Sequence, residues 1–271
     1  MMKKQAIGIF DSGIGGLTIA KAIKEVLPNE DFIYFGDTAH MPYGDKSEEA
    51  IVAYSKKITD FLVNFHCKMI VIACNTASSF AYEILKEILP KHILLVNVID
   101  PVIDSIHTNS INSVGVLGTK AMVSSNIYTR KIYSKYPHVS TVEVATPLFA
   151  SMIEEGFFRN AISNSVIEAY LSNKELSNKE ALILGCTHYP LIHQEISEFF
   201  DNEKIIIDSP KLVAKYVKET LEKTTQLYLG ETKGRYQFFM SLYTESFEET
   251  AKLFFDEFIH FEQFDLWKEI R

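Results

Sequence analysis

Two cysteines in this chain end apolar runs of the same kind and precede small polar residues. Cys74 ends the run MIVIAC and is followed by Asn-Thr, and Cys186 ends ALILGC and is followed by Thr-His. A lone cysteine after a strand is usually structural, because its side chain behaves as a small hydrophobic group. Cys67, which has no such polar neighbours, is interpreted in that way. The matched surroundings of the other two favour a chemical role.

Two equivalent thiols that face one pocket suit the transfer of a proton across a stereocentre. A thiolate on one face removes the proton from Cα, and a thiol on the other face returns one. The reverse reaction exchanges these roles. Such proton transfer needs pKa values near the working pH, and a helix start lowers a thiol pKa from about 8.5. We therefore expect Cys74 and Cys186 to lie at helix starts and to act as acid/bases.

Other kinds of catalytic site require patterns that the sequence lacks. Neither C-x-x-C nor H-E-x-x-H occurs, and no Walker loop or G-x-S-x-G elbow is present. The stretch GIGGLT (13–18) does not fit G-x-G-x-x-G, so its glycines are as consistent with a tight turn as with a site. A Cys-His hydrolase would leave the second thiol unexplained. We expect no cofactor and no metal.

Short apolar runs alternate with longer amphipathic ones, which is typical of parallel sheets covered by helices on both faces. The predicted strands span residues 6–10, 32–35, 69–73, 93–98, 113–118, 141–145, 181–185 and 204–208. Helical patterns include residues 47–65, 79–89, 211–223 and 246–261. Polar clusters that could bind a ligand follow four strands at their carboxyl ends, at residues 11–13, 36–38, 74–76 and 186–188.

The alternation of strands and helices occurs twice. IGIFDSGIGG starts at Ile7 and VGVLGTKAMV starts at Val114, an offset of 107 (114 − 7) that is close to the 112 (186 − 74) between the cysteines. Duplicated halves of about 100 residues explain both offsets, although α/β proteins look repetitive in any case. We expect an α/β fold of two pseudo-symmetric, doubly wound domains with mainly parallel sheets and the active site in the cleft between them. The first domain comprises residues 1–98 and 209–271, and the second comprises residues 99–208.

Composition places the chain among globular proteins of the cytoplasm. It has 271 residues, of which 47% are hydrophobic, with a net charge of −8 and a pI near 5.5. Lysines and arginines form no basic stripe, which argues against nucleic acid as a partner. Three cysteines make no disulfide framework. The N-terminus has too few apolar residues for a signal peptide, and no stretch is long enough to span a membrane.

Six motifs together resemble the glutamate racemases, of the cofactor-independent aspartate/glutamate racemase superfamily. They are GIFDSGIGGLT (8–18), YFGDTAHMPYG (34–44), ACNTAS (73–78), GVLGT (115–119), IEEG (153–156) and LGCTHYPL (184–191). The resemblance extends from Gly8 to about Ser209 and, more loosely, to the end of the sequence. CTHYPL is the most informative motif, because aspartate racemases tend to have Glu in the place of His188.

The resemblance implies a role for each matched residue. Cys74 and Cys186 would be the catalytic acid/bases, with Cys186 deprotonating L-glutamate and Cys74 deprotonating D-glutamate. The polar assistants would be Asp11 near Cys74, and His188 and Glu154 near Cys186. The substrate contacts would be Asp11, Ser12, Tyr43, Gly44, Asn75, Thr76, Thr119, Thr187 and His188. The implied product is D-glutamate for peptidoglycan, made by a cytoplasmic homodimer.

Three residues depart from the pattern of these racemases. His40 stands where Arg is common, Met122 replaces a frequent threonine, and Pro210 stands where glycine is usual. None of these departures alters a cysteine, so we expect the activity to be kept. We expect their effects on affinity and regulation instead. An aspartate racemase and a non-catalytic thiol sensor on the same scaffold remain the alternative functions. The sensor is disfavoured because neither cysteine has been lost.

Overall fold

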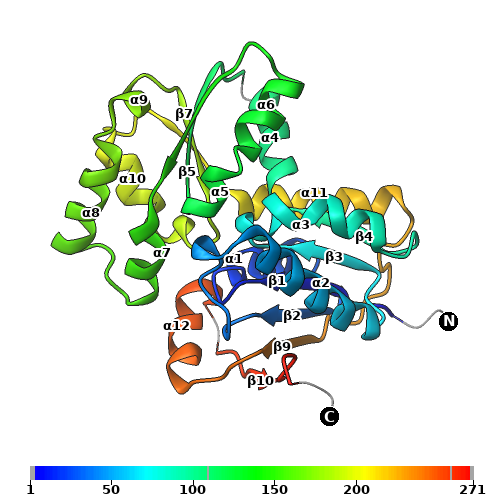
Figure 1. Ribbon diagram of the computed structural model, residues 1–271. Helices are drawn as coiled ribbons and strands as arrows, with labels where there is room; N and C mark the ends of the chain where they lie inside the picture. Colours follow the sequence, from blue (N-terminus) through cyan, green and yellow to red (C-terminus); the bar gives the residue numbers. More distant parts are fainter. Residues whose placement is uncertain (1–3, 109, 257, 269–271) are drawn as a thin grey trace.

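The computed structural model describes residues 4–108, 110–256 and 258–268 (Figure 1). Residues 1–3 of the N-terminus discussed above, and residue 257 in the last expected helix, lie outside these ranges. Within them the chain forms two separate parallel sheets with helices around both. The expected α/β class with two mainly parallel sheets is confirmed.

The first sheet, in the described residues, has six strands in the order β10-β9-β2-β1-β3-β4. Its strands are β1 (Ile7–Asp11), β2 (Phe32–Gly36), β3 (Met69–Ile72), β4 (Leu94–Asn97), β9 (Tyr236–Met240) and β10 (Glu262–Gln263). Side chains of alternate residues enter two different cores: Ile7 and Ile9 pack on one face and Phe10 on the other. Both faces are therefore buried, as a doubly wound sheet requires.

The second sheet repeats the order of four consecutive strands of the first. Its four described strands lie in the order β6-β5-β7-β8, where β5 is Ser113–Gly118, β6 is Ser140–Ala145, β7 is Ala181–Gly185 and β8 is Ile205–Ile207. This order matches β2-β1-β3-β4, so β1 corresponds to β5 and β3 to β7. The predicted duplication of an α/β half is therefore seen in the strand order as well as in the sequence offsets.

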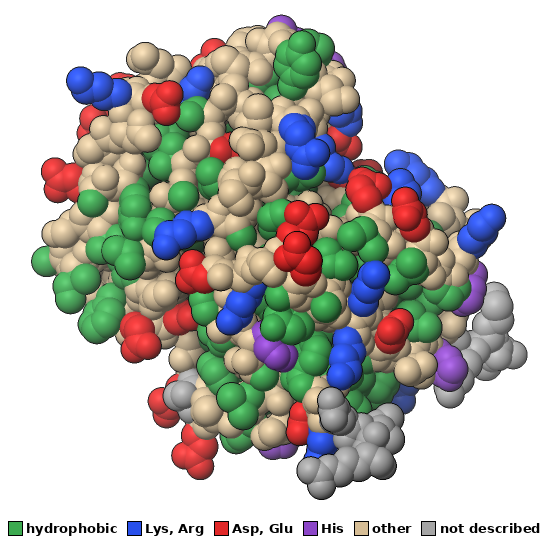
Figure 2. Space-filling model, in the orientation of Figure 1, with side chains coloured by type: hydrophobic (Ala, Val, Ile, Leu, Met, Phe, Trp, Pro, Cys, Tyr) green, Lys and Arg blue, Asp and Glu red, His purple; other side chains and the backbone are tan. Residues whose placement is uncertain are grey.

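Helices connect the strands and cover the sheets. They are α1 (Leu17–Val26), α2 (Glu48–Asn64), α3 (Asn75–Ile88), α4 (Ile99–Thr108), α5 (Lys120–Ser124), α6 (Ile127–Lys135), α7 (Pro147–Glu154), α8 (Ala161–Leu171), α9 (Lys174–Ser177), α10 (His193–Phe199), α11 (Ser209–Lys223) and α12 (Glu245–Phe255). Short 3₁₀ turns form η1 (Tyr43–Asp45) and η2 (Tyr189–Ile192). None of the described helices is long and apolar enough to cross a membrane. On the face drawn in Figure 2, acidic and basic side chains are interspersed.

The C-terminal segment returns to the first sheet, but partly as strands that the sequence analysis did not predict. Strand β9 pairs with β2, with Phe32 opposite Tyr236, and β10 pairs with β9. The helical pattern expected over 246–261 ends at Phe255, because Asp256 has a left-handed backbone with φ of 60°. This return agrees with a discontinuous first domain. The exact domain boundaries stay a prediction.

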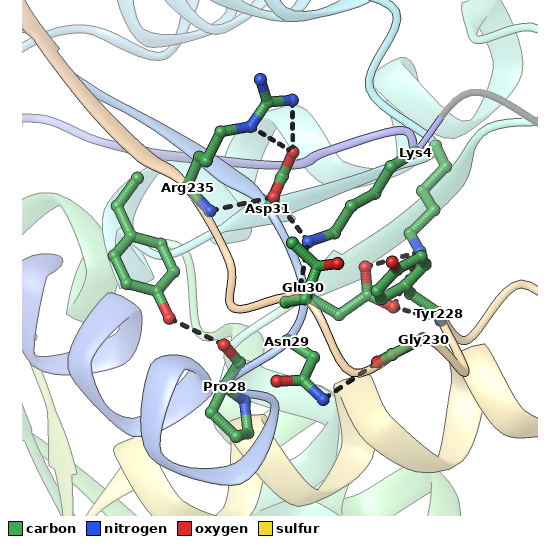
Figure 3. Close-up of polar contacts among 11 residues, drawn as sticks. Lys4, Pro28, Asn29, Glu30, Asp31, Tyr228, Gly230 and Arg235 are labelled. Atoms are coloured by element: carbon green, nitrogen blue, oxygen red, sulfur yellow. Dashed lines mark hydrogen bonds and ion pairs between the residues drawn. The ribbon is translucent and has the colours of Figure 1, made fainter.

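Charged side chains join the C-terminal segment to the amino end of β2, far from the carboxyl ends of the strands (Figure 3). Asp31 accepts bonds from Lys4 Nζ at 2.8 Å and from the backbone N–H and guanidinium of Arg235, both at 2.9 Å. Burial by itself raises the pKa of Asp31, but the bonds from Lys4 and Arg235 outweigh it and hold the pKa below its usual range.

Next to Asp31, Glu30 and Lys68 form a buried ion pair. Lys68 Nζ lies 2.7 Å from Glu30 Oε2 and also donates to the Gln226 carbonyl at 2.6 Å. Glu30 is 2% exposed and Lys68 is 6% exposed. Removing one member of such a pair leaves an uncompensated buried charge, whereas neutralising both members costs much less.

We expect Lys68→Met to lower the free energy of unfolding by about 3 kcal/mol, because Glu30 loses its only described cationic partner. Urea denaturation followed by circular dichroism measures this change. The double variant with Glu30→Gln keeps an acceptor for the Tyr228 N–H and should recover about half of the loss. Equal stability of the single variant and the wild type would show that the pair is not stabilising.

Candidate active site

A small pocket lies where the carboxyl ends of β3 and β7 face each other. Its lining comes from both halves: Ser12, Gly13, Met41, Pro42, Tyr43, Gly44, Cys74, Asn75, Thr76, Thr119, Ala150, Glu154, Gly185, Cys186, Thr187 and His188. Every predicted site residue is in this set except Asp11, which lies fully buried behind it. In each sheet the pocket adjoins the switch point of the strand order, β1/β3 or β5/β7, where α/β proteins bind ligands.

Cys74 caps the start of α3. Its Sγ accepts a bond from the Ala77 N–H at 3.4 Å and lies 3.7 Å from Ser12 Oγ. Burial and the nearby charge of Asp11 nevertheless raise the pKa of Cys74 to about 12, although the Ala77 and Ser12 bonds lower it. The helix start is as expected, but the expected lowering of the pKa is wrong for Cys74. The thiol form dominates at neutral pH.

Asp11 connects the two halves at the back of the pocket. Its Oδ2 accepts the Gly13 N–H at 3.0 Å, and its Oδ1 lies 3.5 Å from Thr187 Oγ1. Burial raises the pKa of Asp11 even though the charge of His188 lowers it. The glycine turn is needed here for close approach: a Cβ on Gly15 would lie 2.5 Å from the His188 ring. The turn of DSGIGG therefore serves the site.

Cys186 has a different environment from Cys74. Its Sγ lies 3.6 Å from His188 Nδ1, and His188 Nε2 lies 2.7 Å from Glu154 Oε1. Burial by itself lowers the pKa of His188, but the bonds to Cys186 and Glu154 raise it well above its usual value. His188 is therefore an imidazolium, held between a sulfur and a carboxylate. Phe254 of α12 packs edge-on against its ring.

The element after Cys186 differs from the helix that was expected. Residues 186–188 form a bend and turn, the 3₁₀ helix η2 begins at Tyr189, and α10 begins only at His193. Pro190 accounts for part of this difference, because proline has no N–H to donate within a helix. The local positive charge at Cys186 comes from His188 rather than from a helix terminus.

Asn75 carries an unused donor in the pocket. Its Oδ1 accepts from the Tyr128 hydroxyl at 2.8 Å, whereas its Nδ2 is buried without a partner among the described residues. The Tyr128 bond fixes the amide so that the free N–H groups remain for a ligand. Tyr128 was not predicted as a site residue, since it lies on α6, 53 positions along the chain. No local pattern marks it.

Contacts between the halves also surround Thr76, Thr119 and Gly44. Thr76 Oγ1 and Thr119 Oγ1 lie 2.9 Å apart, and a Cβ on Gly44 would lie 2.7 Å from Thr119 Cβ. Thr119 caps α5 by accepting the Met122 N–H, so its hydroxyl is already engaged. These residues lie at the junction of the two halves, and their contacts help to set the distance between the halves beside the pocket.

Two of the departures noted in the sequence have structural reasons. Met122 is fully buried, and its Cε lies 1.9 Å from where a Cβ on Gly118 would stand, so it packs directly against that glycine. Pro210 lies in the first turn of α11, where a missing N–H costs no helical bond. Neither residue lines the pocket.

No group of three or more His, Cys, Asp or Glu side chains that could hold a metal occurs in residues 4–108, 110–256 and 258–268. The pocket instead presents two cysteine sulfurs, the His188 ring paired with the Glu154 carboxylate, and several neutral donors. This set can bind a carboxylate and move a proton between opposite faces of a carbon atom.

Comparison with known proteins gives consistent results. Residues 16–217 match the Asp/Glu/Hydantoin racemase family. A glutamate racemase of Geobacter metallireducens is 41% identical over 241 residues, covering 89% of this chain and 88% of the relative. The crystal structure of Francisella tularensis glutamate racemase in complex with D-glutamate has a TM-score of 0.91 at 37% identity, covering 97% of this chain and 98% of that one. A glutamate racemase isoform of Bacillus anthracis has a TM-score of 0.92 at 30% identity, with the same coverage of both chains.

The contrast between the two thiols predicts unequal alkylation. Cys74 and Cys186 are 6% and 7% exposed, so access does not distinguish them. The His188 imidazolium stands beside Cys186, whereas the pKa of Cys74 is about 12, so iodoacetamide near neutral pH should label Cys186 about tenfold faster. Peptide mass spectrometry measures both rates. His188→Asn should remove the difference, and faster labelling of Cys74 in the wild type would contradict this account.

Proposed function

Because this chain belongs to the Asp/Glu/Hydantoin racemase family, we propose that it interconverts L- and D-glutamate by proton transfer at Cα between two cysteines. The observation that carries the proposal is the presence of Cys74 and Cys186 in one pocket, each after the equivalent strand of its sheet. Relatives named glutamate racemase at 36–41% identity support glutamate as the substrate. The two-base mechanism is our inference from the geometry.

In the L-to-D direction we propose Cys186 as the base and Cys74 as the acid, because His188 lies 3.6 Å from Cys186 Sγ. The Cys186 thiolate, beside the His188 imidazolium, takes the Cα proton of L-glutamate, and the electron pair of the C–H bond remains on Cα. The Cys74 thiol then gives its proton to the opposite face of Cα. D-glutamate leaves behind a protonated Cys186 and a Cys74 thiolate. In the D-to-L direction the same two residues act in reverse order.

The polar groups of the pocket supply substrate contacts. The free Nδ2 of Asn75 is a donor without a described partner and suits a substrate carboxylate. Ser12, Tyr43, Gly44, Thr76, Thr119, Thr187 and His188 are the further contacts that we propose. Asp11 assists proton transfer at Cys74, and Glu154 holds the imidazolium of His188 at Cys186.

The size of the pocket implies that the halves move apart to admit substrate. The cavity has a volume of about 30 Å³, enough for about two water molecules but not for an amino acid. A larger open cleft of about 840 Å³ shares Gly44 with it and is also lined by residues of both halves. Its charged lining residues are Lys46, Lys120 and Arg130 together with Asp45 and Glu48, so cations are in slight excess for the approach of an anionic substrate.

We also propose the cellular setting. D-glutamate is a component of bacterial peptidoglycan, so the activity would supply cell-wall synthesis from the cytoplasm. The working form would be a homodimer. The proposed domain division, with residues 1–98 and 209–271 in one unit and 99–208 in the other, puts one of the two pocket cysteines, Cys74 or Cys186, in each unit.

We expect the dialysed protein to racemise L-glutamate without an added cofactor. The circular dichroism signal of the amino acid should fall toward zero, because enantiomers have equal free energy and the equilibrium constant is one. Pretreatment with a chelator should leave the rate unchanged. A rate that depends on added metal, or turnover of aspartate but not of glutamate, would contradict the proposed function.

Each cysteine should serve one enantiomer, since an enantiomer presents its Cα–H to one face only. Cys74→Ser and Cys186→Ser should each slow racemisation by about three orders of magnitude, because a hydroxyl is a far weaker acid than a thiol. A glutamate analogue with a leaving group on nitrogen needs only one base for elimination. We expect Cys74→Ser to eliminate from the L analogue and Cys186→Ser from the D analogue. Identical preferences in the two variants would contradict two opposed bases.

A further inference from the structure

A buried carboxylate lies beside the pocket, in the first sheet. Asp37 directly follows β2 and is fully buried. Its Oδ2 accepts from the Tyr43 hydroxyl at 2.7 Å, and its Oδ1 accepts from Ser241 Oγ at 2.8 Å and Trp267 Nε1 at 3.0 Å. His40 Nδ1 lies 3.0 Å from Oδ2. The four partners of this Asp37 cluster come from three separate parts of the chain.

The Asp37 cluster joins the end of the described chain to the turn that carries Tyr43. Tyr43 is 1% exposed and lines the pocket with Cys74. Trp267 packs edge-on against the His40 ring at 4.3 Å and against Tyr54 at 5.3 Å. The His40 ring in turn stacks on Tyr54 at 4.0 Å. The same carboxylate therefore orients a pocket tyrosine and holds the C-terminal segment.

The order of the strands explains how the C-terminal segment reaches the turn that carries Tyr43. Ser241 follows β9, which pairs with β2, and Trp267 comes after β10, which pairs with β9 in the same parallel sheet. The segments after these strands therefore gather at the carboxyl edge, on the same edge as Asp11 and Cys74. Phe264 continues this contact, because its N–H donates to the Met240 carbonyl at 2.9 Å.

We propose that Asp37 is a positioning residue for Tyr43 and that the C-terminal segment around Trp267 is part of the substrate-binding apparatus. This inference rests on the proposed function and assigns to it two residues that do not line the pocket. Asp37 Oδ2 accepts the Tyr43 hydroxyl and so fixes its direction, while Oδ1 accepts from Ser241 and Trp267. The Trp267 N–H and the Ser241 hydroxyl hold the carboxylate in place. Loss of the tryptophan bond should loosen Tyr43 and weaken substrate binding.

The variant Trp267→Phe removes the Nε1–H donor and keeps an aromatic ring against His40. We expect KM for both enantiomers of glutamate to rise about fivefold, with kcat within about twofold of the wild type. Asp37→Asn places an amide N–H opposite a group that itself donates, such as the Tyr43 hydroxyl or the Trp267 N–H. We expect it to raise KM more than Trp267→Phe does. Lys57→Ala is the matched control, since its ammonium lies over the Trp267 ring at 5.0 Å without touching the Asp37 bonds. It should leave KM unchanged.

Fluorescence gives a second readout that a purely structural role would not move. Trp267 is the only tryptophan in the sequence, so emission excited selectively at tryptophan reports on the Asp37 cluster. Saturating D- or L-glutamate should change this emission in the wild type. In Tyr43→Phe, which keeps the ring but lacks the hydroxyl, the change should be lost.

The positioning role is overturned if KM of Trp267→Phe and Asp37→Asn equals that of the wild type. It is equally overturned if those variants lose kcat and thermal stability together at unchanged KM. A wild-type tryptophan emission that does not change on addition of glutamate would also overturn it. These results are distinct from a failure of the proposed function, in which the wild type itself does not turn over glutamate.

Discussion

The site depends on the meeting of two sheet edges. The carboxyl ends of β1 and β3 face those of β5 and β7, and each edge delivers one thiol to the same small pocket. Direct contacts across the junction hold this arrangement, among them Thr76 to Thr119 and Tyr128 to Asn75. The hydrophobic core reinforces it, because one cluster of buried side chains runs from β1 through α4 and α11 into β5 and β7.

The two thiols are equivalent in position but not in charge. Cys186 has a cation at its side, held by Glu154, whereas Cys74 has a neutral hydroxyl and a buried carboxyl near it. A duplicated fold therefore supplies the geometry of opposed bases, and residues that differ between the two halves give each thiol its own electrostatic surroundings. The difference originates in single residues, above all His188, whose counterpart after Cys74 is Thr76.

Much of this could be predicted from the sequence, because the informative signals are local. An apolar run that ends in Cys-Asn-Thr or Cys-Thr-His identifies a strand end whatever lies elsewhere in the chain. Strand β9 was missed because its place in the sheet depends on pairing between Tyr236 and Phe32, which are 204 positions apart (236 − 32). The raised pKa of Cys74 was missed for a related reason. Burial is a property of the assembled halves, and it outweighs the helix start that the sequence indicates.

The late position of β9 and β10 in the chain also affects synthesis. A ribosome makes β1 to β4 first, but β2 remains an unpaired edge until residues 236–240 have emerged. The four described strands of the second sheet lie within residues 113–207, so they have all been synthesised before residue 236. Unpaired edges invite association with other chains. The half that is translated first is therefore the last to be completed, and a nascent chain stalled before Tyr236 carries an exposed strand.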